Sequence, residues 1–540
     1  MSLSAGRARG RARSGPDAIV VGAGHNGLVA ANILADAGWD VLVCEATPHV
    51  GGAVRSGEVT AKGYVSDLFS AFYPLAAASP VLAALNLGEH GLTWSHAPTV
   101  LSHLFPDGRC ATLSRDIDAT VASLSDFDSR DGDAWRQLVA EWDTVRGPLL
   151  QAVFTPFPPL APTVKILRAM RVGGTLRFAR LAALPVRRLA EERFHGAGAG
   201  MLLAGNALHA DLSPDSAGSA LYGWLLTMLG QTYGFPVPVG GAGELTRALA
   251  DRLRARGGQI RTTSPVQDIL TSGGVATGVR LRGGEIIGAR RAVLADVGAP
   301  LLYRDLLSDT ALPARLKEDL DNFQWDTPTL KVDWALSGPV PWINPAAAGS
   351  GTVHLGVDLD GLSVYASDLA RRRAPAQPFL LFGQMSTSDA SRSPAGTESA
   401  WGYTHLPPGA AKDPDLVAQQ VDRVEDTIER VAPGFTRSII GRYVQSPSQL
   451  QEENPNLVTG AINGGTAQLH QQLVFRPVPG LGGAATVFDR LYLAGSSAHP
   501  GGGVHGAPGA NAARAALARD RPTGPLRRRA TAAALEHIYR

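Results

Sequence analysis

The feature that most constrains this chain is residues 17–55, where a strand, a glycine turn, a helix and a second strand follow one another. The apolar run Ala18–Val21 is typical of a buried parallel strand. A helix is expected from about Leu28 to Ala37, because small and apolar residues recur on one face and Gly38 ends the pattern. The second strand, Val41–Cys44, is followed at once by Glu45. This order predicts a βαβ unit that binds a dinucleotide.

The turn carries the GxGxxG pattern at Gly22, Gly24 and Gly27. Gly22 permits the tight turn, Gly24 lets the backbone approach a pyrophosphate, and Gly27 lets helix and strand pack closely. The helix N-terminus favours the anion, and the Glu45 carboxylate can accept hydrogen bonds from ribose hydroxyls. We therefore expect these four residues to bind the cofactor.

The composition limits the classes of function. The chain has 540 residues, 44% of them hydrophobic and 18% charged, which is enough for two domains with a sizeable core. The net charge of +2 gives no reason to expect nucleic acid as a partner. Cys44 and Cys110 are the only cysteines, so the sequence predicts neither a disulfide framework nor a cysteine metal cluster. A cytoplasmic location fits this cysteine content.

Three stretches could be targeting or membrane segments. Residues 1–16 carry four arginines but no apolar core, so we expect a disordered basic tail rather than a secretory signal; a transit peptide is the alternative. Residues 216–243 carry no charge, but many are Gly, Ser, Thr or Gln, which favours a buried helix over a membrane span. Residues 165–188 place arginines among apolar residues, a pattern of either a solvated helix face or a helix on a membrane surface.

A second glycine-rich landmark lies at residues 489–517. A strand, Leu491–Ala494, leads into Gly495, and a helix is expected to begin near residues 509–511. Between them, Gly501–Gly503 would let a planar ring lie against backbone without a Cβ in the way. The N-terminus of the following helix can stabilise negative charge.

The rest of the chain predicts an α/β protein whose Rossmann-type domain is discontinuous. Residues 238–300 read as a glycine turn, an amphipathic helix and several strands, among them a hairpin around Gly283–Gly284. We expect the dinucleotide-binding domain to comprise residues 17–95, 235–300 and 480–522. An α+β substrate or cap domain is expected from residues 96–234 and 301–479, and a tail from residues 523–540.

Several motifs together resemble one family. The run VGAGHNGLVAA, the Gly51–Gly52 pair after Glu45 and the segment AGSSAHPGGGVHG resemble the FAD-dependent oxidoreductases related to phytoene desaturase, within the amine-oxidase-like flavoproteins. The branch it is most similar to is called pyridine nucleotide-disulphide oxidoreductase domain protein 2-like. The resemblance implies non-covalently bound FAD. It implies further cofactor-binding roles for His25, Asn26, Gly51, Gly52, Val266, Gly495, Gly502, Gly503 and Val504. Relatives place Arg directly after the Gly–Gly pair, whereas this chain has Ala53 there and Arg55 two residues on, which we include as a cofactor-binding candidate.

The candidate catalytic residues also rest partly on the resemblance. Amine-oxidase relatives have a strand lysine that holds a water at flavin N5, and TLKVDWALSGPVPW, with Lys331, is similar to that stretch; a surface strand lysine is the alternative. Residues 63–75 correspond to the segment beside the flavin, or else form a plain core turn. His499 and His505 flank the glycines; they lack a third partner for a metal, so no metal site is expected. His505 or water would take the proton that leaves after hydride transfer to flavin N5.

The resemblance leaves four functions to separate. The leading hypothesis is dehydrogenation of an apolar small molecule such as a polyene or isoprenoid. Amine oxidation and redox-neutral isomerisation are alternatives on the same scaffold. A binding protein for lipidated partners, like the Rab GDP-dissociation inhibitors, belongs to another class, but the intact glycine set and Glu45 favour a working cofactor site. Peripheral membrane contact is a further expectation, and the sequence does not indicate an oligomeric state.

Overall fold

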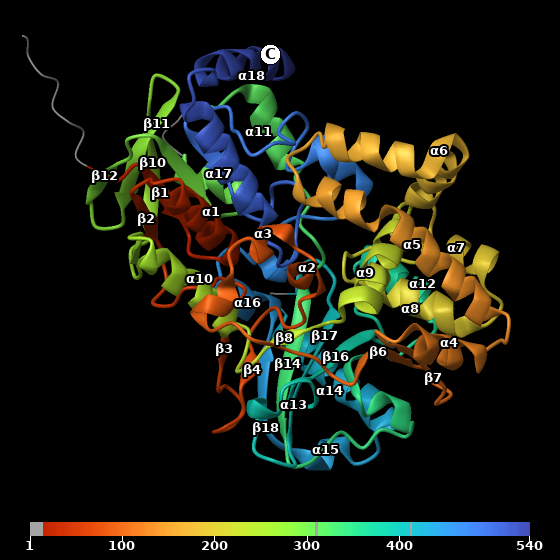
Figure 1. Cartoon of the computed structure of the whole chain (residues 1–540). Helices are drawn as coiled ribbons and strands as arrows, with labels where there is room; N and C mark the ends of the chain where they lie inside the picture. Colours follow the sequence, from red (N-terminus) through yellow and green to blue (C-terminus); the bar gives the residue numbers. More distant parts are fainter. Residues whose placement is uncertain (1–14, 308–311, 411–412) are drawn as a thin grey trace, which may run out of the picture.

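Two large sheets organise the molecule, seen in a computed structural model that describes residues 15–307, 312–410 and 413–540 (Figure 1). The first is a five-stranded parallel sheet in the order β19-β13-β1-β2-β9. Its strands are β1 (Ala18–Val21), β2 (Val41–Cys44), β9 (Gln259–Arg261), β13 (Ala292–Ala295) and β19 (Leu491–Leu493). Three distant parts of the chain thus form one sheet. All three parts fall within the segments predicted for the dinucleotide domain.

Helices α1 (His25–Asp36), α10 (Gly243–Ala255) and α17 (Ala507–Asp520) pack together beside this sheet (Figure 1). The fully buried Asn32 of α1 donates to the carbonyls of Leu28 and of Leu249 in α10, both at 2.9 Å. Helix α1 begins three residues earlier than expected, because the Gly24 carbonyl already accepts the Leu28 N–H. The βαβ unit predicted from the sequence is present.

A three-stranded antiparallel sheet lies at the edge of this layer. It consists of β10 (Val266–Ser272), β11 (Val275–Leu281) and β12 (Ile286–Gly288). The Gly284 N–H donates to the Leu281 carbonyl, so the hairpin predicted around Gly283–Gly284 is confirmed.

The second large sheet has seven strands in the order β18-β14-β17-β16-β15-β6-β7. Its strands are β6 (Thr99–Leu104), β7 (Cys110–Leu113), β14 (Thr329–Leu336), β15 (Ser350–Leu355), β16 (Leu380–Gln384), β17 (Glu398–His405) and β18 (Ile439–Gln445). Trp334, Phe382 and Phe435 pack together against one face, with Trp334 and Phe382 stacked at 5.9 Å between ring centroids. The other face of β14 and β17 carries Lys331 and Tyr403 as register neighbours. All seven strands fall within the segments predicted for the cap domain.

A group of helices packs beside the seven-stranded sheet. They are α4 (Ile117–Ser125), α5 (Asp131–Phe154), α6 (Leu160–Ala183), α7 (Val186–Arg193), α8 (Ala197–Leu208) and α9 (Ser219–Tyr233). In α9, Trp224 is buried edge-on against Trp142 of α5, with the ring centroids 5.6 Å apart. The buried-helix interpretation of residues 216–243 is therefore confirmed. In the described ranges, we find no helix with the length and apolar character needed to cross a bilayer.

The remaining elements include further helices and two two-stranded sheets. The helices are α2 (Pro74–Ala77), α3 (Pro80–Ala83), α11 (Ala314–Asp321), α12 (Leu359–Ala370), α13 (Met385–Ser388), α14 (Pro414–Val431), α15 (Phe435–Ser438), α16 (Pro447–Glu453) and α18 (Gly524–Ile538). The two small sheets pair β3 (Ser56–Gly57) with β4 (Ser66–Asp67), and β5 (Trp94–Ser95) with β8 (Val237–Pro238).

The prediction of a tail at residues 523–540 is wrong. The segment forms α18, and Leu535 and Tyr539 are buried in the core beneath the five-stranded sheet. Tyr539 also donates its hydroxyl to the Pro479 carbonyl at 2.7 Å. Leu535 and Tyr539 stand four residues apart, so they share one helix face and anchor it. Of the predicted N-terminal tail, residues 1–14 lie outside the described residues.

Candidate cofactor and active site

The turn between β1 and α1 is packed so closely that only glycine fits. Gly22 has φ +97° and donates its N–H to the Cys44 carbonyl at 2.8 Å, which ties the turn to β2. A Cβ on Gly24 would lie 2.5 Å from Asp296 Oδ2, and one on Gly27 would overlap the Gly22 carbonyl. The first turn of α1 is thereby held at the carboxyl edge of the sheet, where a helix N-terminus stabilises an anion.

Asp296 is a site residue that the sequence reasoning missed. It follows β13, is buried, and accepts the Gly27 N–H at 2.8 Å. Burial, together with the charge of Glu45, raises the pKa of Asp296 to about 7. The sequence carried a signal, because the apolar strand Ala292–Ala295 runs directly into this acid, as Val41–Cys44 runs into Glu45.

Glu45 is held in place by the turn that it follows. Its Oε2 accepts the Ala23 N–H at 2.8 Å, and its Oε1 accepts both the N–H and the hydroxyl of Thr47 at 2.8 Å. A carboxylate oxygen has two lone pairs, so acceptor capacity remains for ribose hydroxyls. The geometry of this buried carboxylate fits its predicted role.

The Gly51–Gly52 turn lies against the first glycine turn. Gly51 has φ +120° and donates its N–H to the Ala23 carbonyl at 2.8 Å. Arg55 folds back over the pair, because its Nε donates to the Gly52 carbonyl at 3.1 Å and its guanidinium lies 5.1 Å from the Phe69 ring centroid. Burial lowers the pKa of Arg55. Arg55 thus reaches the Gly–Gly turn although it stands two residues later than the family's arginine.

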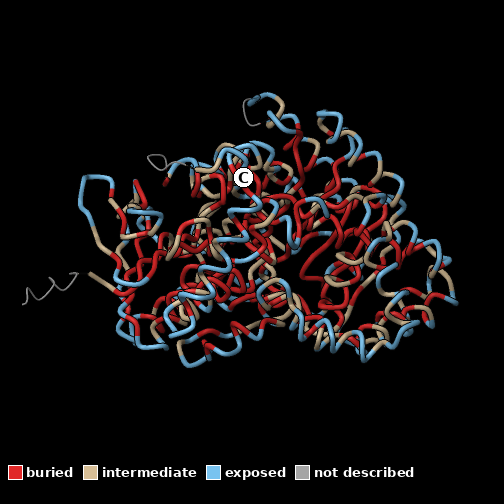
Figure 2. The backbone as a smooth tube through the Cα atoms, turned by 90° about the horizontal axis from the view of Figure 1, so that it is seen from above, coloured by how far each residue is buried: buried red, intermediate tan, exposed pale blue. Residues whose placement is uncertain are grey.

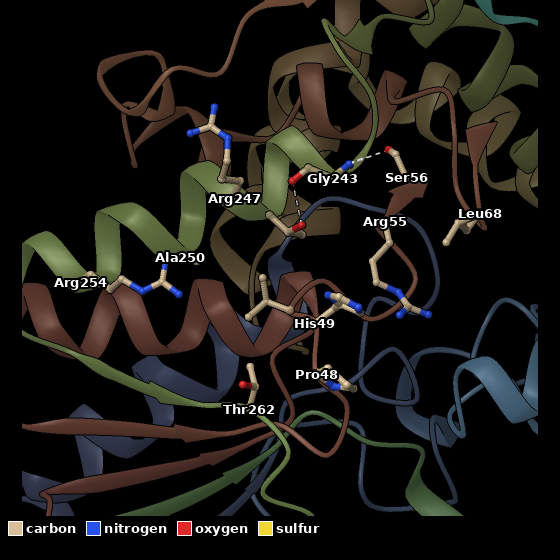
Figure 3. A pocket seen from close by; sticks show the side chains of 12 residues that line it. Pro48, His49, Arg55, Ser56, Leu68, Gly243, Arg247, Ala250, Arg254 and Thr262 are labelled. Atoms are coloured by element: carbon tan, nitrogen blue, oxygen red, sulfur yellow. Dashed lines mark hydrogen bonds between the residues drawn. The ribbon is translucent and has the colours of Figure 1, made fainter. Parts of the chain in front are cut away.

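A cavity of about 550 Å³ opens between the loop after β2 and helix α10 (Figure 3). The loop contributes His49 and Arg55, and α10 contributes Arg247 and Arg254. The other lining residues are Pro48, Val50, Ser56, Leu68, Gly243, Thr246, Ala250 and Thr262. The cavity adjoins the Glu45 turn and has a basic lining, which fits the adenosine diphosphate half of FAD.

Val266 is the first residue of β10 and is half-buried beside Leu281 of β11. It is not part of the cavity lining, so its contact with adenine stays a prediction.

The glycine-rich crossing after β19 packs against segments far away in the chain. A Cβ on Gly495 would lie 2.6 Å from the Val297 carbonyl oxygen, one on Gly502 2.8 Å from the Asn463 carbonyl oxygen, and one on Gly503 2.7 Å from Leu75 Cδ1. Protein atoms occupy the space into which these side chains would point. The glycines therefore let four chain segments meet, and the contact of a planar ring with the crossing stays a prediction.

Three histidines surround this crossing. His25 is the first residue of α1, while His499 and His505 stand at the two ends of the glycines, and all three are buried. Burial lowers the pKa of His25 and His499 to about 4 and that of His505 to about 3, so all three imidazoles are neutral at pH 7. The Nδ1 of His505 accepts the Ala507 N–H at 3.1 Å, which leaves the proton on Nε2. His505 can therefore donate a hydrogen bond, and protonating it would break its bond to α17.

The crossing leads into the N-terminus of α17, where several backbone N–H groups have no partner among the described residues. Gly506 is the N-cap of α17, and the N–H groups of Val504, His505 and Gly506 make no hydrogen bond to the described residues. Nearby, the buried Asn26 Oδ1 has no hydrogen-bond partner in the described part of the chain. Buried polar groups are normally paired, so these free donors and this acceptor fit a bound flavin.

Lys331 is buried in β14, so the surface-lysine interpretation is wrong. Its side chain is 4% exposed, and its ammonium forms an ion pair with Asp333 two residues on. Burial raises the pKa of Asp333 to about 6, although Lys331 opposes this rise. The strand alternation places both side chains on the face that carries Tyr403 and Trp401. The role of Lys331 at flavin N5 stays a prediction.

An aromatic face connects this sheet to the glycine crossing. Trp401 and Tyr403 stack with ring centroids 5.9 Å apart and planes 10° apart, and Phe72 lies 6.1 Å from Trp401. Three residues after Phe72, Leu75 reaches Gly503. Residues 72–75 thus bridge the sheet face and the crossing, and the position of the 63–75 segment beside the flavin stays a prediction.

Two buried charges that the sequence reasoning missed hold the loop beneath Gly502. Asp326 accepts the N–H groups of Ile462, Asn463 and Gly465 at 2.6–3.0 Å. Arg476 donates to the carbonyls of Asn463, Gly464, Gly465, Thr466 and Ser496, the last at 2.8 Å. Burial raises the pKa of Asp326 to about 6 and lowers that of Arg476 to about 10. No local motif marks either residue, because both act on segments brought close only by folding.

Among the described residues, no cluster of three or more His, Cys, Asp or Glu side chains has a geometry suited to a metal ion. The chemistry of this donor set is that of a flavin site: a glycine turn, an acid for the ribose, free N–H groups and neutral imidazoles.

Comparison with known proteins names the family. The model of the family "Flavin containing amine oxidoreductase" matches residues 27–399. The chain is 29% identical to a pyridine nucleotide-disulfide oxidoreductase domain-containing protein 2 from Rattus norvegicus, over 92% of each chain. It is 28% identical to a hydroxyneurosporene desaturase from Cereibacter sphaeroides, over 93% of this chain and 98% of that one.

The fold matches solved structures as well. An oxidoreductase from Methanosarcina mazei aligns with a TM-score of 0.63 at 16% identity, over 93% of this chain and 99% of that one. The phytoene desaturase-related resemblance and the FAD assignment are thereby confirmed. The chain belongs to the flavin containing amine oxidoreductase family and is an FAD-dependent oxidoreductase.

Proposed function

We propose that this oxidoreductase dehydrogenates an apolar small molecule, such as a polyene or an isoprenoid. The observation that carries the proposal is that three buried carboxylates each already contact other groups of the chain. Asp333 forms an ion pair with Lys331 through one oxygen, Asp326 accepts three N–H groups, and Asp211 accepts the Thr327 N–H and lies 3.2 Å from His405. None of these three carboxylates is therefore an uncompensated charge that would recognise an ionic substrate.

The residues around the expected FAD position have separate roles. When bound, FAD supplies the hydride acceptor for the substrate C–H bond. Glu45, the first turn of α1 and the Gly51–Gly52 turn would hold the nucleotide half. The N–H groups of Val504, His505 and Gly506, near the start of α17, would stabilise negative charge on a bound flavin. Because the Nδ1 of His505 already accepts the Ala507 N–H, water is the better acceptor for the leaving proton.

The first test is the visible spectrum of the purified protein, followed by anaerobic mixing with apolar dehydrogenation substrates and with amines of equal size. Loss of the oxidised flavin bands with an apolar compound, and not with an amine, is the expected result. Reduction by amines alone would contradict the proposal.

His505→Ala tests the positioning role. We expect the variant to keep FAD and to reduce it at least about tenfold more slowly, because the Ala507 N–H and the crossing lose their anchor. His505→Asn, whose side-chain carbonyl can accept the same N–H, should recover part of the rate. Unchanged reduction in His505→Ala would remove the residue from the mechanism.

Amine oxidation is the second candidate, favoured by one observation. The stacked Trp401 and Tyr403, with Phe72 beside them, present aromatic surface of the kind that attracts an ammonium group. The substrate screen separates the two, since this face serves either an amine or a hydrocarbon chain.

A further inference from the structure

Helix α6 is unusual because it hardly contributes to the core. Of its 24 residues, only Pro162 and Leu181 are buried. The backbone of Arg171, at φ 55° and ψ 178°, breaks it into two straight pieces. In Figure 1 the helix stands at the upper edge of the molecule, above α5. A helix with so few buried residues gains little from packing on its own chain.

Several of the side chains that α6 exposes are apolar. The first piece exposes Leu160 (71%), Val164 and Leu167 at the i, i+4, i+7 spacing of one helix face, and the second exposes Val172 (79%) and Leu176 (68%). A second segment, the loop at 469–475, adds exposed apolar residues: Leu469, Leu473, Val474 and Phe475. We call these nine residues the α6 patch.

The two segments meet at Phe157, in the connection between α5 and α6. A Cβ on Gly482 would touch Leu473, Val474 and Phe157 together. The 469–475 loop therefore lies beside the start of α6. The first piece of α6 and the 469–475 loop thus form one region from two distant parts of the chain, and Val172 and Leu176 follow on the second piece of the helix.

The charges that α6 itself carries all have one sign. Residues 160–183 contain Lys165, Arg168, Arg171, Arg177 and Arg180 and no acidic residue. Arg180 pairs with Glu192. Within the described part of the chain, no carboxylate pairs with Arg168, Arg171 or Arg177. Three uncompensated guanidinium groups thus border exposed aliphatic side chains.

We propose that the α6 patch docks the protein on the surface of an anionic lipid bilayer. An interfacial helix buries its apolar side chains at the headgroup boundary while Arg and Lys bind acidic headgroups, and α6 has both features. No described helix can span a bilayer, so α6 lies on the surface. The occupant is a bilayer rather than a folded partner, because eight of the nine patch residues are aliphatic and the charges that α6 places beside them have one sign.

The same region leads to the glycine crossing. Phe154, at the end of α5, lies 5.4 Å from the His505 ring, and Phe157, at the patch, lies 5.7 Å from the His499 ring. The end of α5 and the patch thus contact the histidines that flank the crossing, so docking would turn this side of the site toward the bilayer. The docking itself does not rest on the proposed function.

Vesicle flotation of the FAD-loaded protein tests the docking. Vesicles of phosphatidylcholine with phosphatidylglycerol should carry the protein upward, and phosphatidylcholine alone should carry much less. Arg168→Glu/Arg177→Glu should lower the partition coefficient at least about tenfold, and Leu176→Glu should lower it at least about threefold. The matched controls are Arg371→Glu/Arg373→Glu and Ile286→Glu, which change exposed residues elsewhere.

Two results would overturn the docking proposal. One is equal flotation of the patch variants and the controls. The other is a wild-type dimer in sedimentation that Leu176→Glu converts to a monomer, with no binding to vesicles, since the patch would then join two copies. Flavin absorbance of each purified variant, measured before flotation, confirms that it is folded. Failure of the substrate screen would leave the flotation result standing, so the two proposals fail separately.

Discussion

At the scale of single residues, the site depends on side chains whose protonation is set by burial. Asp296 accepts the N–H of Gly27, which lies in the turn where a pyrophosphate is expected. The pKa of Asp296, about 7, lies far above the ordinary 3.8. An acid whose pKa is raised by folding binds more protons in the native state than in the unfolded state. Stability is therefore lost as the pH rises from about 4 to about 7.

We expect Asp296→Asn to remove that loss. Between pH 5 and pH 8, the wild-type apoprotein should lose about 2–3 kcal/mol more unfolding free energy than the variant, because one pKa unit corresponds to about 1.4 kcal/mol. Urea denaturation at the two pH values measures this. Glu285→Gln, at an exposed acid paired with Arg261, is the control and should behave like the wild type. Parallel pH dependence in Asp296→Asn would contradict the shifted pKa.

Lys331 and Asp333 form a buried pair, and removing one partner should cost far more than removing both. Lys331→Met leaves the Asp333 carboxylate buried without its cation, which costs about 3–5 kcal/mol. Lys331→Met/Asp333→Leu should recover most of that loss in urea denaturation. If the double variant is stable and still reduces its flavin slowly, Lys331 acts in the reaction; a normal rate would show that the pair is structural.

At the scale of elements, the glycine crossing acts as a junction for chain segments. Gly502→Ala would place a Cβ 2.8 Å from the Asn463 carbonyl oxygen, and the loop held by Asp326 and Arg476 would have to move. We expect a loss of about 1–3 kcal/mol in stability and weaker FAD retention. Gly483→Ala, where nothing lies within 4 Å of the new Cβ, is the control. Equal behaviour of the two variants would show that the crossing is not tightly packed.

At the scale of the whole molecule, the FAD site joins parts of the chain that are hundreds of residues apart. The first glycine turn, Asp296 and the crossing at 495–506 all border it. A ligand that binds only the folded state should stabilise them together, by about 2.7 kcal/mol at a free concentration one hundred times Kd. Thermal unfolding of the apoprotein with added FAD measures this gain. FMN, which lacks the adenosine half, should give less; an equal effect of FMN would contradict a contribution from Glu45 and the cavity.

The local motifs were predictable because the interactions that form them join residues close together in the sequence. The βαβ unit, the hairpin at Gly283–Gly284 and the glycine segment after Leu493 depend on residues within a few turns of one another, so spacing alone indicates them. The tail assigned to residues 523–540 failed, because the anchoring of Tyr539 depends on a core formed by distant strands.

The sequence by itself determined the cofactor class, since glycines, an acid and strand–helix order over 40 residues specify a dinucleotide turn. Only the tertiary structure decided which side chains share the site. Asp326, Arg476 and Asp296 carry no local signature, and their roles arise from burial beside backbone groups far away in the chain. The pairing of Lys331 with Asp333 was likewise decided by burial, because a surface lysine and a buried one have the same sequence pattern. The electrostatic interactions of a buried group depend on its distance in space from other groups. The spacing of residues along the chain does not give that distance.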